Sequence, residues 1–69
     1  MPQTLSQFVK SQRKKHNLTQ SQLADRAGVG LRFIRDLEQE KPTLRLDKVN
    51  QVLGLFGHSM HPAPTRIEP

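Results

Sequence analysis

Two histidines spaced three residues apart are the first side chains in this sequence that could bind a metal ion. His58 and His61 have this spacing, but they follow Gly57 and precede Pro62 instead of lying within a helical segment. The chain has no cysteine, and no nearby carboxylate completes a tetrahedral site. We expect no bound metal ion and no other cofactor.

Serine hydroxyls are the next group to consider, because they become nucleophiles when a neighbouring base and an orienting acid activate them. No histidine and acidic residue are arranged to do so here. The sequence also has neither a Gly-x-Ser-x-Gly turn nor a phosphate-binding glycine loop. It therefore predicts a protein that is not an enzyme.

The strongest chemical signal is an excess of positive charge. The chain has 11 lysines and arginines against 6 aspartates and glutamates, so its formal net charge is +5. This balance suits a polyanion, either a nucleic acid or an anionic membrane surface. The 3 aromatic residues are all phenylalanines, which disfavours a platform for stacking single-stranded bases. No stretch resembles a membrane span or a signal peptide, so we expect a cytoplasmic protein.

A basic amphipathic segment near the N-terminus keeps binding to a membrane surface as an alternative. Such binding needs a broad exposed apolar face, whereas Leu5, Phe8 and Val9 are needed for the core of so small a domain. We therefore expect no membrane partner. The basic run at residues 13–15 fits a solvated helix face as well as a phosphate contact.

The length of 69 residues allows one domain. A domain of this size buries only about 60% of its unfolded surface, and without cysteines no disulfide can stabilise it. Close helix packing and oligomerisation remain as sources of stability. We expect residues 1–60 to form this domain and residues 61–69, with three prolines, to form a flexible tail.

Apolar spacing predicts four helices, at residues 5–16, between Thr19 and Gly28, at residues 31–39 and at residues 46–56. The first two begin with capping boxes, in which a threonine caps the helix and a glutamine follows three residues later. These pairs are Thr4 with Gln7 and Thr19 with Gln22. Asn17 and Gly28 are placed to end the two helices in a left-handed conformation.

The last predicted helix carries two adjacent apolar stripes, whereas a core this small needs one. The stripe that we assign to the core consists of Leu46, Val49, Leu53 and Phe56. Val52 and Leu55 are then left for an interface between two copies of the chain. We expect a homodimer, to which Met60 and its neighbours could add a short C-terminal intersubunit strand before Pro62 stops the pairing.

Residues 18–38 combine two short helical segments with a tight turn that contains glycine. Ala24 and Ala27 allow the segments to approach closely, Gly28 supplies the turn, and Ile34 and Leu37 face inward together. This arrangement is typical of a helix-turn-helix. Its second helix can enter the major groove of DNA while the N-terminus of the first faces a phosphate.

Residues 18–29 read Leu-Thr-Gln-Ser-Gln-Leu-Ala-Asp-Arg-Ala-Gly-Val, with Ile34 and Glu38 following. The stretch resembles the XRE-type, lambda-repressor-like helix-turn-helix family, and the resemblance covers residues 5–57. It implies an all-α, lambda-repressor-like bundle of four helices. Within the family the chain is most similar to HipB-type antitoxins, because Glu38, Leu46, Val52 and Ser59-Met60 fall in register with them.

The resemblance implies roles for individual residues. Gln20 and Ser21 occupy phosphate-contacting positions, and Arg13 with Glu38 occupies the position of a salt bridge between two helices. The positions that face the groove are Leu31, Arg32, Arg35 and Asp36. From its place in the following loop, we expect Lys41 to contact the DNA backbone in a sequence-independent way.

Three positions depart from the family pattern. Gly30 precedes the recognition helix where Ser or Thr is frequent, and Arg45 stands where relatives often have a capping Thr or Ser. Leu31 can contact only a thymine methyl or a sugar, so hydrogen-bonded reading of bases falls to Arg32 or Arg35. These two arginines could also simply solvate an exposed helix, but the motif assigns them to the groove-facing side.

The sequence therefore predicts a sequence-specific transcriptional repressor that binds an inverted-repeat operator in double-stranded DNA as a homodimer. The resemblance to HipB-type proteins implies an antitoxin that binds a HipA-type serine/threonine kinase and autoregulates its operon. Two alternatives stay open at this point. One is a stand-alone phage-type repressor, and the other is a kinase-binding module in which DNA binding is secondary.

Overall fold

Four short helices make up the part of the chain that the computed structural model describes, residues 4–60. They are α1 (Leu5–Lys15), α2 (Gln20–Ala27), α3 (Leu31–Glu38) and α4 (Leu46–Leu55). No strand occurs within these residues, so the all-α class expected from the sequence is confirmed. The expected tail at residues 61–69 lies outside the described residues.

The first two helices begin as the capping boxes predict. Thr4 Oγ1 accepts a hydrogen bond from the Gln7 backbone N–H at 3.2 Å, and Gln7 Oε1 accepts one from the Thr4 N–H at 3.0 Å. Thr19 and Gln22 repeat this exchange at 3.1 and 2.9 Å. Each box bonds two backbone donors that a helix start would otherwise leave without a partner.

All four helices end in the same way, with a left-handed residue and a pair of crossed backbone hydrogen bonds. After α3, for example, the Glu40 N–H bonds to Leu37 O at 3.4 Å and the Lys41 N–H bonds to Asp36 O at 3.1 Å. The left-handed residues are Asn17, Gly28, Glu40 and Gly57. Glu40 was not expected from the sequence, because a side chain disfavours this conformation.

The core is formed by apolar side chains from all four helices and from the turn before α2. These buried residues are Val9, Leu18, Leu23, Ala24, Ile34, Leu37, Val49, Val52 and Leu53. Two sequence predictions for α4 were wrong. Val52, assigned to the dimer interface, is 0% exposed in the single chain, while Leu46, assigned to the core, is 56% exposed.

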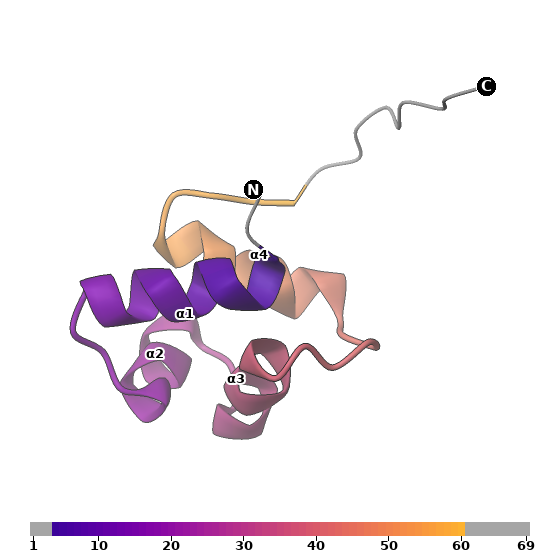
Figure 1. Ribbon diagram of the computed structural model, residues 1–69, viewed down its shortest axis with the longest axis horizontal. Helices are drawn as coiled ribbons and strands as arrows, with labels where there is room; N and C mark the ends of the chain where they lie inside the picture. Colours follow the sequence, from indigo (N-terminus) through magenta and orange to yellow (C-terminus); the bar gives the residue numbers. More distant parts are fainter. Residues whose placement is uncertain (1–3, 61–69) are drawn as a thin grey trace.

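Val52 is buried instead of Leu46 because of the side on which α4 packs against its neighbours. α4 packs on α2, while α3 packs on both α1 and α2. Figure 1 shows α2 and α3 together along the lower side, with α1 and α4 above them and the segment 57–60 crossing above α4. None of the described helices has the length and hydropathy of a membrane span.

Candidate nucleic-acid interface

The turn between α2 and α3 sets the angle at which the two helices meet. Gly28 has φ 74°, and both its N–H and that of Val29 bond to Ala24 O at 3.0 Å. A Cβ on Gly28 would meet only Gln51 Nε2, at an ordinary 3.7 Å, so glycine is needed here for its φ and not for space. Leu23 and Ile34 are buried where the helices pack.

The N-terminus of α2 offers backbone donors to an anion. The Thr19 capping box and the bond from Leu23 N–H to Thr19 O use the neighbouring donors. The N–H groups of Gln20 and Ser21 have no acceptor within the helix, and the Ser21 side chain is exposed. A phosphate can accept hydrogen bonds from both groups and gains from the positive end of the helix dipole.

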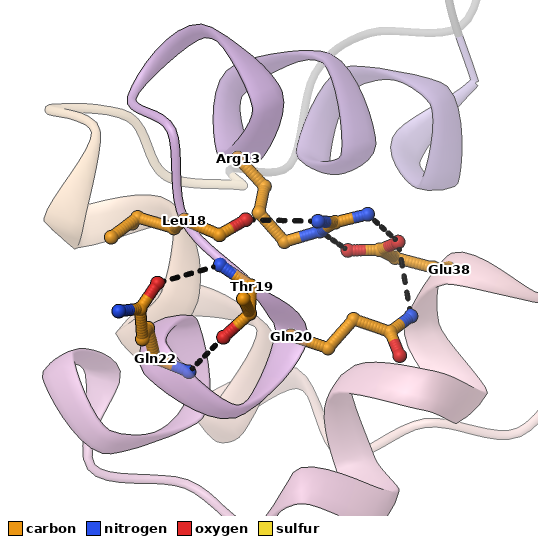
Figure 2. A network of polar contacts seen from close by, with 6 residues as sticks. All are labelled: Arg13, Leu18, Thr19, Gln20, Gln22 and Glu38. Atoms are coloured by element: carbon orange, nitrogen blue, oxygen red, sulfur yellow. Dashed lines mark hydrogen bonds and ion pairs between the residues drawn. The ribbon is translucent and has the colours of Figure 1, made fainter.

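Figure 2 shows a polar network that ties α1, α2 and α3 together behind this helix end. Arg13 donates through Nε to Glu38 Oε2 at 2.7 Å and through a terminal nitrogen to Oε1 at 3.1 Å. Its other terminal nitrogen donates to Leu18 O at 2.9 Å. The structure thus contains the Arg13–Glu38 ion pair that the family resemblance implies, and the Glu38 side chain is only 2% exposed.

The side chain of Gln20 belongs to the same network. Its Nε2 donates to Glu38 Oε1 at 3.2 Å (Figure 2). This contact could not be predicted from the sequence, because Gln20 and Glu38 lie 18 positions apart. In this structure, the groups of Gln20 that remain open to a phosphate are the backbone N–H and the second hydrogen of the amide.

The outer side of α3 presents two arginines to solvent. Arg32 and Arg35 are exposed, and within residues 4–60 neither guanidinium forms an ion pair or a hydrogen bond. Leu31, the first residue of α3, is half-buried, as is Phe33. Asp36 lies one turn beyond Arg32 on the same face. The face therefore carries unpaired donors suited to base edges or phosphates.

The remaining cations near α3 already have partners. Lys41 Nζ lies 3.5 Å from Asp36 Oδ2, and Lys48 Nζ lies 6.0 Å from the centre of the Phe33 ring. Arg45 pairs with Asp47 at 2.8 Å, and its side-chain hydrogen bond lowers the pKa of Asp47. Sequence reasoning did not include Lys48 in the site. The sequence pattern does not indicate that Lys48 lies beside α3, because this position depends on how Phe33 packs.

Of the three residues assigned to a dimer interface, two are exposed and one is buried. Leu55 and Met60 are 41% and 46% exposed, whereas Val52 is in the core. The segment that ends at Met60 is held by a 2.7 Å hydrogen bond from the Met60 N–H to Asn50 Oδ1, and it forms no strand pairing with any other described residue of the chain. His58 packs edge-on against Phe8, with ring centres 4.8 Å apart.

Residues 9–60 match the helix-turn-helix family model. The chain is also 51% identical, over 59 residues, to an uncharacterized HTH-type transcriptional regulator, y4mF, of Sinorhizobium fredii. That alignment covers 86% of this chain and 78% of the relative. The matched region spans all of α2, α3 and α4 and most of α1.

Proposed function

Because this chain belongs to the helix-turn-helix family, we propose that it is a sequence-specific repressor that binds double-stranded DNA. The relative of Sinorhizobium fredii, by its name a transcriptional regulator, supports this function. The observation that carries the proposal is the outer face of α3, where Arg32 and Arg35 are exposed and have no anionic partner among residues 4–60.

In the proposed complex α3 enters the major groove and the N-terminus of α2 meets a phosphate. Arginine forms a bidentate contact with guanine O6 and N7, which distinguishes a G·C pair from the other base pairs. The backbone N–H groups of Gln20 and Ser21 and the charge of Lys41 contact the phosphate backbone instead. These contacts position the protein without reading sequence.

We propose that two copies bind together on an inverted repeat. Leu55, at the end of α4, and Met60, in the segment after it, are exposed apolar side chains, and exposed apolar side chains on so small a domain favour an interface. Two-fold symmetry would place the recognition helices roughly 34 Å apart, which is one turn of DNA. Repression then follows from occupation of the promoter.

The test compares Arg35→Ala with Lys41→Ala on a selected operator and on random duplex DNA, over a range of salt concentrations. Arg35→Ala should weaken operator binding by about 1–3 kcal/mol and random binding much less, because it removes a base contact. Lys41→Ala should weaken binding to both duplexes alike and reduce the salt slope by about 1. Equal losses on both duplexes for Arg35→Ala would remove its base-reading role.

We further propose that the protein is the antitoxin of a HipA-type kinase and represses its own operon. The support is the register of Glu38, Leu46, Val52 and Ser59-Met60 with HipB-type proteins. Co-expression with a HipA-type kinase should give a complex that remains intact during purification. No complex would favour a stand-alone repressor, while a complex that binds no operator would favour a kinase-binding module.

A further inference from the structure

Asp36 is the one carboxylate that α3 presents on its outer side, since the other acid of this helix, Glu38, is buried. The Asp36 side chain is 26% exposed and lies one helical turn beyond Arg32. It therefore occupies the same face as an arginine that has no ion pair within residues 4–60, at the point where the proposed function places base edges.

An aspartate at this position is electrostatically unfavourable for two reasons unless its carboxylate makes a favourable contact with the DNA. It lies in the last turn of α3, where the negative end of the helix dipole repels a carboxylate. It would also face the negative phosphates of DNA. The fold supplies one compensation, because the loop after α3 turns back and brings Lys41 Nζ to 3.5 Å from Asp36 Oδ2.

The Asp36 oxygen that Lys41 does not contact can accept a hydrogen bond, and only some bases offer a donor for it. The contact with Lys41 uses Oδ2 and leaves Oδ1 for a donor. An ionised carboxylate only accepts hydrogen bonds, and the major groove offers two amino donors, cytosine N4 and adenine N6. The adenine amino group lies beside the N7 acceptor, which repels a carboxylate, whereas cytosine N4 has no acceptor next to it on the same base.

We propose, on the basis of the function proposed above, that Asp36 reads a cytosine in each half-site and that Lys41 offsets its charge against the phosphates. Arg32, one turn earlier on the same face, reads a guanine nearby. One helical turn is about 5.4 Å and base pairs are about 3.4 Å apart, so the two bases lie in the same or adjacent base-pair steps. Asp36 is thus a specificity-determining residue.

The experiment selects binding sites from a pool of random 30-base-pair duplexes with the full chain and with its Asp36→Asn and Asp36→Ala variants. The wild-type protein should enrich a cytosine at one position of each half-site. Asp36→Asn should change that position to adenine, because asparagine pairs with adenine N6 and N7. Asp36→Ala should remove the preference there, which is about a tenfold or larger loss of discrimination.

Matched variants separate base reading from charge. Asp25→Asn removes an exposed carboxylate on α2 and should leave the selected sequence unchanged. Lys41→Gln should weaken binding to every duplex while the cytosine preference stays. Circular dichroism and thermal melting establish that each variant is folded.

Two results would overturn the inference, and they can be told apart. If Asp36→Asn and Asp36→Ala keep the wild-type sequence preference and change binding uniformly, Asp36 acts only through its charge or its pairing with Lys41. If the wild-type protein enriches no sequence at all, the proposed function fails together with the reading of cytosine.

Discussion

Removing one partner of the buried ion pair should cost this domain a large part of its stability. Arg13→Met keeps the length of the side-chain stem but removes the three donors that bond to Glu38 and to Leu18 O. The Glu38 side chain is 2% exposed in the intact pair, and after the substitution the Gln20 amide is the one donor to its carboxylate that remains among residues 4–60. The perturbation therefore leaves a charge without adequate compensation.

The size of the effect follows from this burial. Breaking a buried ion pair by removal of one partner costs about 3–5 kcal/mol. Small domains unfold with a free energy near the lower end of about 5–15 kcal/mol, so Arg13→Met should be close to unfolding. Glu38→Leu combined with Arg13→Met removes both charges, and the double variant should be more stable than the sum of the two single losses predicts. We expect a coupling energy of about 2–3 kcal/mol.

The measurement is urea unfolding followed by circular dichroism, at one protein concentration for all variants because association also stabilises the fold. The loss of the Leu18 O bond and of the Gln20 bond each occurs on both sides of the cycle and cancels. The matched control is the exposed pair Asp36 and Lys41, whose cycle should give about 0–1 kcal/mol. Additive losses for Arg13 and Glu38 would refute the argument, because the pair would then behave as a solvated one.

Two further substitution pairs test the helix ends and the proposed dimer. Leu55→Glu should give a monomer at micromolar concentration in sedimentation velocity, whereas Leu46→Glu, which changes a more exposed leucine at the other end of α4, should remain dimeric. A dimeric Leu55→Glu protein would locate the interface elsewhere. Gly28→Ala should destabilise the fold by about 1 kcal/mol, because its φ of 74° strains any side chain. Gly54→Ala, in a helix interior with open space around it, should stabilise it by up to about 1 kcal/mol in the same urea assay, and the opposite order would contradict the assignment of the turn.

The ends of the helices could be predicted from the sequence because the interactions that set them are local. Thr4 with Gln7 and Thr19 with Gln22 exchange hydrogen bonds over three positions, and Gly28 needs no distant partner to adopt its left-handed conformation. The expected boundaries of the first, third and fourth helices were each one residue too long at the C-terminal end, because they included the C-capping residues His16, Gln39 and Phe56.

The residues on the outward face of α3 could also be predicted from the sequence. The buried positions Ile34 and Leu37 set the direction in which Arg32 and Arg35 point, because a helix has a fixed angle between successive residues. What the tertiary structure added is that both arginines lack an anionic partner in the described part of the chain, while Asp36 and Lys41 meet each other across the end of the helix.

Contacts between residues far apart in the sequence could not be predicted from it and became clear only in the tertiary structure. Apolar spacing alone predicts two apolar stripes on α4, but which stripe is covered depends on where α2 packs against this helix. Val52 is therefore buried in the core, while Leu46 is exposed to solvent. The ion pair between Arg13 and Glu38 was expected only from the family resemblance. The hydrogen bond from Gln20 to Glu38, which completes this polar network, was not expected. A periodic pattern records only the angles around a single helix axis, whereas contacts 18 or 25 residues apart exist only once several axes are fixed relative to one another.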